Sequence, residues 1–278
     1  MGFAGLAAGG VSGRALASGS DGQVAGVFAL PGVRPKTAAT LFVRSTGPTS
    51  ANLEFAVRAS AGGKQLTNFD VEMTKKMHVI VISDDFRYFM HLHPEAHPDG
   101  LFSLPLTVPA PGAYEVYADA LPHGVGQQVF RFPVSFGSGK AGTPELTPTP
   151  RTVHAGPYAV TLGTLSLRAG ETVLLSLDVT KNGAPAADLH PYLGGAAHAV
   201  FINARTLTYT HVHPFAGHMR MKGCDMDMDA PAELAPDAKV DPSMTLHVDA
   251  LAAGTYKLWL QFRGGDRLYV APFVVRAG

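Results

Sequence analysis

The sequence contains one histidine motif twice, with identical spacing in the two copies. His78 is followed by twelve residues and then by His91–Pro94, which read His-Leu-His-Pro, and His198 is followed by twelve residues and then by His211–Pro214, which read His-Val-His-Pro. Histidine is scarce, at 12 of 278 residues, and the two motifs use six of them. Chance does not explain such a repeat, so the chain is predicted to contain two copies of one fold.

Short apolar runs separated by turn residues determine the fold class. Runs rich in Val, Phe, Tyr, Leu and Thr alternate with clusters of Gly, Pro, Asn and Asp, a pattern typical of antiparallel sandwiches. No long segment shows an apolar period near 3.6 residues. We therefore predict an all-β protein made of two tandem antiparallel β-sandwich domains of immunoglobulin-like or cupredoxin-like architecture.

The length suits two domains, and a segment rich in Gly, Pro and Thr between Phe136 and Val153 predicts the linker. The second half is longer between its motif and its closing hairpin: His93 to Gly112 spans 19 residues, whereas His213 to Gly254 spans 41. The predicted organisation is an N-terminal segment 1–22, a first sandwich 23–137, a linker 138–152 and a second sandwich 153–278 with an insertion 214–243.

Composition excludes several classes of function. Lys plus Arg and Asp plus Glu are 22 each, charged residues make up 16%, and no basic cluster occurs, which argues against nucleic acid as a partner. No apolar stretch reaches the length of about 18 residues that a membrane-spanning helix needs. The single cysteine, Cys224, excludes an internal disulfide and a thiolate zinc cluster.

The first twenty residues are small and apolar and include Ala-Leu-Ala, which resembles a signal-peptide cleavage site. Arg14 and the lack of a basic start depart from a complete signal, so the segment is either the end of a secretory signal or a flexible tail. We favour export to the periplasm or the extracellular space, with an N-terminal membrane tether as one form of it.

The motif spacing can build a metal site. Side chains two residues apart on a strand share a face, so the two histidines of each His-x-His point the same way. The first histidine can return to them through a hairpin, and three imidazoles suit Zn, Cu, Ni or Fe. The predicted ligands are His78, His91 and His93 in one set and His198, His211 and His213 in the other.

The insertion adds a sulfur-rich stretch, and thioether and thiol groups select Cu(I). Copper, as Cu(I) or Cu(II), is therefore the first candidate metal, and zinc is the second. The sulfur residues predicted to take part are Met219, Met221, Cys224, Met226 and Met228. The alternative is structural: the histidines hydrogen-bond to backbone groups at a strand corner, and the insertion is a surface loop without a chemical role.

Several stretches resemble a known group of proteins. KMHVIVISDDFRYFMHLHPE, GAYEVYAD and DLHPYLGGAAHAVFINARTLTYTHVHP are similar to those of bacterial secreted or membrane-tethered proteins with tandem immunoglobulin-like domains, which resemble YtkA-like and FixH-like modules. The likeness covers nearly the whole chain after about residue 20. It implies an exported β-sandwich protein and an association with copper handling or oxidase assembly. His190 stands where such proteins usually have Glu, and the sulfur-rich insertion is peculiar to this chain.

These observations predict an exported copper-binding protein that buffers or delivers the metal, with the metal ion and a membrane or envelope protein as partners. The rival is a metal-free interaction or scaffold module of the cell envelope with structural histidines. Motifs for nucleophilic, phosphate-binding or HExxH chemistry are missing from the sequence, so we expect no enzyme, with a copper redox enzyme as a third option. The oligomeric state and the metal are left open.

Overall fold

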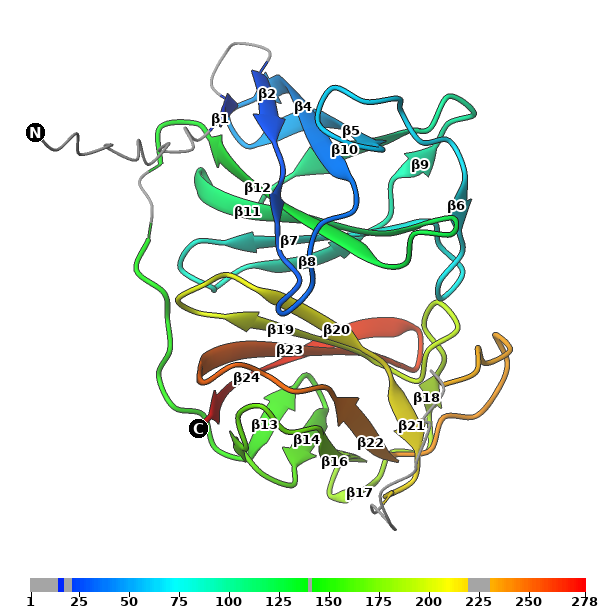
Figure 1. The fold of residues 1–278 in the computed structure, drawn as a ribbon. Coiled ribbons are helices and arrows are strands. Elements are labelled where there is room, and N and C mark those ends of the chain that lie inside the picture. The colour runs from blue at the N-terminus through cyan, green and yellow to red at the C-terminus, as the bar shows by residue number, and fades with distance from the viewer. Residues whose placement is uncertain (1–14, 18–21, 140–141, 220–230) are drawn as a thin grey trace, which may run out of the picture.

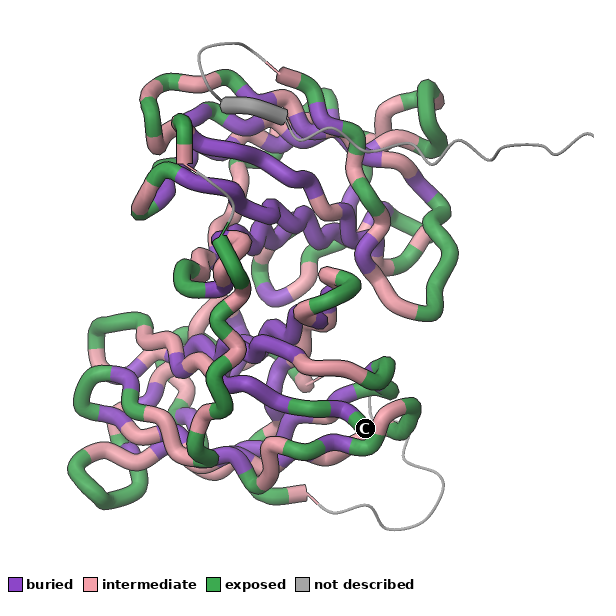
Figure 2. The backbone as a smooth tube through the Cα atoms, turned by 90° about the vertical axis from the view of Figure 1, so that its left-hand side faces the viewer, coloured by how far each residue is buried: buried purple, intermediate pink, exposed green. Residues whose placement is uncertain are grey.

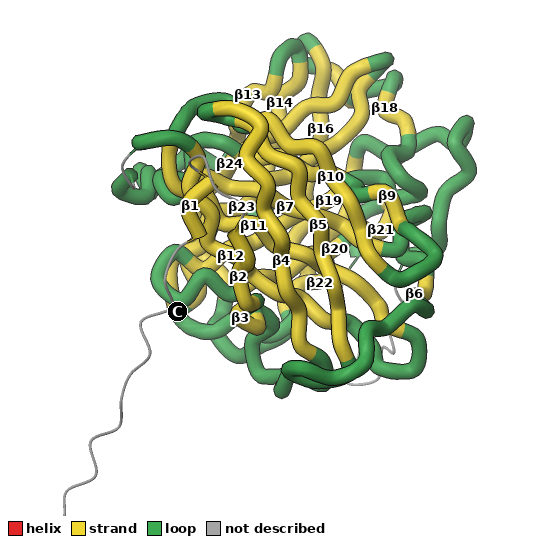
Figure 3. The backbone as a smooth tube through the Cα atoms, turned by 90° about the horizontal axis from the view of Figure 1, so that it is seen from above, coloured by secondary structure: helices red, strands yellow, loops and turns green. Residues whose placement is uncertain are grey.

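The computed structural model describes residues 15–17, 22–139, 142–219 and 231–278, which form strands, turns and loops (Figure 3). No helix that could span a membrane is present in this described part of the chain. The strands of the first half are β1 (Ala15–Ala17), β2 (Gly22–Ala25), β3 (Val27–Phe28), β4 (Ala38–Gly47), β5 (Ser50–Arg58), β6 (Phe69–Asp70), β7 (Met77–Ser83), β8 (Phe89–Leu92), β9 (Glu95–Ala96), β10 (Leu101–Thr107), β11 (Gly112–Pro122) and β12 (Gln128–Phe136). The strands of the second half are β13 (Thr152–Ala155), β14 (Tyr158–Leu162), β15 (Ser166–Leu167), β16 (Val173–Lys181), β17 (Ala184–Pro185), β18 (Leu189–His190), β19 (His198–Asn203), β20 (Tyr209–Val212), β21 (Pro214–Ala216), β22 (Ser243–Val248), β23 (Gly254–Gly264) and β24 (Arg267–Ala277).

Each half is a sandwich of two sheets with the same strand order. The outer sheets run β2-β4-β5-β10-β9 and β13-β14-β16-β22-β21, with β17 beside β16. The inner sheets run β1-β12-β11-β7-β8, with β3 and β6 alongside, and β15-β24-β23-β19-β20, with β18 alongside. One pair in each half is parallel, β1 with β12 and β15 with β24, and the other pairs of the described strands are antiparallel. The prediction of an all-β chain with two repeated sandwiches is confirmed.

A tyrosine at the start of one inner strand marks both halves as immunoglobulin-like. The hydroxyl of Tyr114 on β11 donates to the carbonyl of Ala110, and that of Tyr256 on β23 donates to Ala252, each over 2.8 Å. A buried tyrosine that bonds back to the backbone four residues earlier is the tyrosine corner of immunoglobulin sandwiches. This bond gives a physical role to the Gly-x-Tyr pattern that the two halves share.

The two inner sheets face each other across the middle of the molecule (Figure 1). All seven residues of β7 and all six of β19 are buried, and Figure 2 shows burial running through the strands on which the halves meet. Val79 and Val81 point into the core of the first sandwich, whereas Ile80 and Ile82 point toward the second half. Because both faces of these strands are covered, HVIVIS and HAVFIN read as continuous apolar runs rather than alternating ones.

The residues between the halves form a third apolar cluster, here named the interface core. Its buried members are Ala29, Ile80, Ile82, Phe86, Tyr117 and Val129 from the first half and Val200, Ile202, Tyr209 and Trp259 from the second. Phe89 stacks on Trp259 with ring centroids 5.2 Å apart, and Tyr209 stacks on Tyr117 at 5.4 Å. Phe89 and Tyr209 occupy equivalent positions in the two halves, as do Tyr117 and Trp259. The contact is therefore reciprocal, like that of a symmetric dimer built from one chain.

The segment predicted as a linker packs along both halves. Its Glu145 amide donates to the Asp85 carbonyl of the first half at 2.8 Å, and the Glu145 carbonyl accepts from the Lys257 side chain of the second at 3.3 Å. Leu146 packs against the interface core. This part of the chain therefore contributes to the contact between the sandwiches.

The extra residues of the second half begin after β21. β21 pairs with β22 as β9 pairs with β10, so the first three residues of the predicted insertion belong to the shared fold. The insertion then returns to the contact between the halves: Glu233 Oε1 accepts from the Thr74 amide at 3.0 Å, and the Leu234 amide donates to the Gly194 carbonyl at 2.7 Å. The end of the insertion is thus fixed on turns from both halves.

Candidate metal centre

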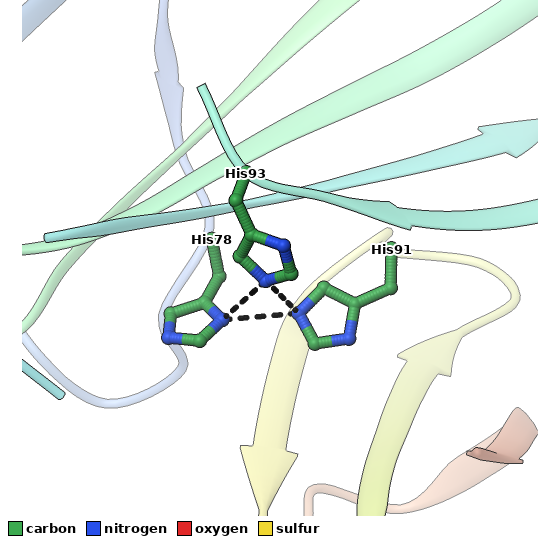
Figure 4. Close-up of side chains that lie close together, drawn as sticks. All are labelled: His78, His91 and His93. Atoms are coloured by element: carbon green, nitrogen blue, oxygen red, sulfur yellow. Dashed lines mark hydrogen bonds between the residues drawn. The ribbon is translucent and has the colours of Figure 1, made fainter. Parts of the chain in front are cut away.

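The alternation along β7 and β8 brings three histidines of the first half together. Met77 and Val79 face the first core, so His78 between them faces the second half, and His91 lies on β8 opposite Ile80. His93 follows two residues later, just past the end of β8. The inward nitrogens are His78 Nδ1, His91 Nε2 and His93 Nε2, and they lie 3.0, 3.2 and 3.3 Å from one another (Figure 4). These three side chains are the first triad.

The second half repeats this arrangement on β19 and β20. His198 Nδ1 lies 3.2 Å from His211 Nε2 and 3.0 Å from His213 Nε2, through the same ring atoms as in the first half. These side chains are the second triad. An ion in tetrahedral coordination, with about 2.0–2.1 Å to imidazole nitrogen, separates its ligand atoms by about 3.3 Å. All three nitrogen separations in the first triad, and the two from His198 in the second, are therefore close to those of a metal site.

The outer nitrogen of the first histidine in each triad faces a backbone carbonyl. His78 Nε2 lies 3.0 Å from the Glu72 carbonyl, and His198 Nε2 lies 2.8 Å from the Tyr192 carbonyl. A carbonyl oxygen only accepts, so both Nε2 atoms carry the proton and donate it. The other nitrogen of a neutral imidazole is then unprotonated, and Nδ1 presents a lone pair to its triad.

The outer nitrogen of the middle histidine in each triad faces a residue from the other half. His91 Nδ1 lies 2.9 Å from the amide oxygen of Gln261, and His211 Nδ1 lies 3.6 Å from a carboxylate oxygen of Asp119. Both acceptors favour the proton on Nδ1, which leaves Nε2 unprotonated and directed into the triad. Asp119 pairs in register with His78, and Gln261 pairs in register with His198, so the two residues occupy equivalent positions. Each of them reaches across to the middle histidine of the other half.

Converging lone pairs are the chemical signature of the site. When both rings are neutral with their outer nitrogens protonated, His78 Nδ1 and His91 Nε2 present lone pairs to each other across 3.0 Å, and either a metal ion or one shared proton relieves this contact. Burial lowers the pKa of His93 to about 3 and that of His198 to about 4, which leaves these rings neutral at pH 7. Burial also lowers the pKa of His91 and His211. The donor set could therefore hold a metal ion.

Asp119 lies in a buried polar pocket beside the second triad. The Gln127 side chain donates to both of its oxygens, at 2.9 and 3.0 Å, and the Tyr209 hydroxyl donates to one at 3.1 Å. Burial raises the pKa of Asp119, against the opposing effects of His78, Gln127 and Tyr209. Burial, and then the nearby Asp119, raise the pKa of Glu72 to about 7. Asp119 and Glu72 thus place two acidic residues beside the histidines.

The structure brings together all six histidines predicted as ligands, although it places them in one shared region rather than in two separate sandwiches. Two groups with metal-site spacing occur among the described residues: His78 with His91 and His93, and His91 with His198 and His211. The second group draws on both halves. The interface core explains this outcome, because it places the two triad-bearing faces against each other.

The predicted sulfur residues are only partly described. The backbone amide of Met219 donates to the Thr245 hydroxyl on β22, in the outer sheet, and the neighbouring His218 lies 3.1 Å from Asp178. The other four residues, Met221, Cys224, Met226 and Met228, lie outside the described residues. Two methionines near the first motif face away from it: Met77 belongs to the first core, and Met90 packs against that core.

Asp119 and Gln261 were not predicted from the sequence, although a signal for them exists. Each stands seven residues after the glycine that opens its strand, Gly112 or Gly254, so an alignment of the two copies pairs them. The carbonyls of Glu72 and Tyr192 carry no such signal, because any residue supplies a carbonyl.

A family model described as "Domain of unknown function (DUF8832)" matches residues 38–136 and 151–278. A comparison with curated proteins gives no match. Among solved structures, a chimeric titin Z1Z2 tandem carrying a fibronectin peptide aligns with 83% of this chain and 91% of its own, at 11% identity and a TM-score of 0.20. Trypsin-activated alpha-2-macroglobulin from Escherichia coli aligns with 91% of this chain, which spans 16% of that protein, at 13% identity and a TM-score of 0.19.

Proposed function

The chain belongs to the DUF8832 family, and we propose that it is a transition-metal-binding protein that holds its ions in the two histidine triads between its sandwiches. One observation supports this above the others: within the first triad three imidazole nitrogens lie 3.0 to 3.3 Å from one another. Imidazole nitrogens that converge at such distances in a largely buried site suit a shared metal ion as ligands. The second triad repeats the arrangement with the same atoms.

Copper is the metal we propose. Imidazole alone binds several first-row ions, and by the Irving–Williams order copper binds most tightly among them. The sulfur-rich stretch from Met219 to Met228 adds ligand types that favour Cu(I), an argument from sequence alone. Zinc is the second candidate, since three imidazoles also suit it.

We further propose that the protein works outside the cytoplasm, where it buffers copper or delivers it to a membrane or envelope partner. The support is the small, apolar N-terminal segment and the resemblance to exported tandem immunoglobulin-like proteins. We propose binding rather than catalysis as its role. In each triad the outer nitrogens of two histidines face a carbonyl, amide or carboxylate group, which suits firm retention of an ion.

The competing function is a scaffold in which the histidines only join the two halves. One observation favours it: the triads lie beside the interface core, and His91 and His211 each contact the other half. In that case the rings contribute to the contact between the sandwiches without binding metal.

Metal retention separates the two functions. The full chain, loaded with copper and desalted, is expected to retain stoichiometric metal in an elemental analysis. His91→Ala with His93→Ala removes two ligands of the first triad and is expected to lower that content. The matched control is His123→Ala with His154→Ala, which removes two exposed histidines outside the triads.

Retention of no copper and no zinc by the unaltered chain would contradict the proposal. So would equal retention by the triad variant and the control. In either case a large loss of stability in the triad variant alone would support the scaffold. Circular dichroism on both variants shows whether each is folded.

A further inference from the structure

The rings of the two triads are almost as close to each other as the rings within each triad, with ring centroids 5.1 to 6.3 Å apart between the sets. Ring centroids of His91 and His198 are 5.1 Å apart, and those of His78 and His211 are 5.5 Å apart. Within the triads the ring centroids are 4.6 to 5.4 Å apart. No protein layer therefore separates the two sets.

His91 belongs to both sets by distance. It forms the first triad with His78 and His93, and it also offers a nitrogen within 4.8 Å of nitrogens from His198 and His211. Since a bound ion lies about 2 Å from its imidazole nitrogens, ions in the two triads would share one buried space. Three protein ligands leave an open position on each ion.

Electrostatics limits what that space can contain. Two dications at close range in a buried site repel each other strongly, because few water molecules screen them. Asp119 offers one buried carboxylate on the side of the second triad. A small anion shared between the open positions would reduce the repulsion further. Two Cu(I) ions would repel each other less than two Cu(II) ions, because each carries a single charge.

We propose that the two triads are a single dinuclear centre whose two copper ions, as Cu(II), are bridged by a hydroxide derived from water. In forming the bridge, water loses one proton to solvent and its oxygen binds both ions, with no change of oxidation state. This inference rests on the proposed function, because it requires the triads to bind metal. It adds that the ligand class of the centre is a small oxygen anion that contacts both ions.

Electron paramagnetic resonance tests this on the full chain titrated with Cu(II). A hydroxide bridge couples the unpaired electrons of the two ions antiferromagnetically. At two equivalents of Cu(II), the spin intensity is therefore expected to be several-fold lower than the amount of bound copper, measured by elemental analysis, would give without coupling. Two retained copper ions with full, uncoupled intensity would overturn the inference and leave the proposed function standing. One retained ion per chain would also overturn it, because six histidines would then share a single ion. Retention of neither copper nor zinc would contradict both this inference and the proposed function.

A variant supplies the matched control. His211→Ala with His213→Ala keeps the first triad intact, and it is expected to bind one copper with its full spin intensity. Persistent loss of intensity in that variant would overturn the inference, since one ion has no partner with which to couple. If this variant does not fold, the titration of the unaltered chain still distinguishes a coupled pair of ions from two separate ones.

Discussion

At the scale of single residues, the proton positions determine what the site can do. A carbonyl behind His78 and another behind His198 favour the proton on the outer nitrogen, so in the neutral ring the inward nitrogen carries the lone pair. The middle histidines differ in their supports. His91 is backed by the neutral Gln261 at 2.9 Å and His211 by the acidic Asp119 at 3.6 Å, so the two supports differ in charge and in distance.

Replacement of Asp119 tests this difference. Asp119→Asn is expected to weaken copper binding at the second triad by about 10- to 100-fold, because the carboxylate that polarises His211 is lost. Gln261→Glu supplies a carboxylate behind His91 and is expected to strengthen binding at the first triad. Competition with a calibrated chelator measures both. Unchanged affinity in Asp119→Asn, in a protein of unchanged stability, would contradict the role given to this carboxylate.

The sequence predicts the ligands better than their supports. Six histidines follow from a repeated spacing, because strand alternation is a local property that a sequence displays directly. The supports follow from strand register and from contacts between halves. Register places Asp119 opposite His78, but nothing local shows that its carboxylate reaches across to His211. Only the packing of the two sandwiches decides that contact.

At the scale of elements, a tight turn ahead of each triad positions the carbonyl. Residues 72–75 and 192–195 each form a two-residue turn closed by reciprocal backbone bonds, and the central residues have positive φ. In the second half the third position is Gly194, whereas in the first it is Thr74 with φ 68°. A β-branched residue in this left-handed region is strained.

Relief of that strain gives a prediction. Thr74→Gly is expected to stabilise the protein by ~0.5–1 kcal/mol, because the lost left-handed penalty exceeds the added chain entropy of glycine. Its backbone bond to Glu233 is retained. Thr67→Gly is the matched control at an exposed position without positive φ, and it is expected to destabilise slightly. Urea unfolding measures both, and a destabilised Thr74→Gly would show that the turn is not strained.

Most strands were predictable because their apolar runs end at Gly, Pro or Asn. The early strands β5 and β16 and the closing hairpins lie where the two copies align. The start of the insertion was less predictable. β21 consists of Pro-Phe-Ala, which carries no strand signal of its own, and it forms because β22 offers an edge to pair with. Pairing with a distant partner is not visible in a short stretch of sequence.

At the scale of the whole molecule, the relation between the two halves is what the sequence left open. Duplication predicted two sandwiches with one site each, and the structure places the sites together. A hint was present in HVIVIS and HAVFIN, since strands without alternation are covered on both faces. That pattern shows that something covers the strand, but not that the partner is the other half of the same chain.

Acid is expected to destabilise the metal-free protein. Burial lowers the pKa of five triad histidines, so between pH 7 and 5 the unfolded chain takes up protons at these residues that the folded chain does not: His91, His93, His198, His211 and His213. Their stabilising contribution is complete above the unfolded pKa near 6.5 and is lost as the pH falls toward the folded values. Glu72 and Asp119 act in the opposite direction, because their raised pKa values let the folded chain bind protons, but two carboxyls do not offset five imidazoles.

Urea unfolding of the metal-free chain at pH 7 and pH 5 measures this effect, and the midpoint is expected to fall at the lower pH. Glu72→Gln removes one opposing group and is expected to make the fall steeper. A midpoint that rises on acidification would contradict the assignment of buried, neutral rings. Added copper is expected to raise the midpoint at pH 7, since a ligand of the folded state stabilises it.

The reciprocal stacking of Phe89 on Trp259 and of Tyr209 on Tyr117 has the form of a contact between two copies of one sandwich. Two free copies would part on dilution, and a ligand set shared between them would be lost with them. Covalent connection holds the partners at an effective concentration in the millimolar range for a short flexible connection. The assembly therefore persists however scarce the protein becomes.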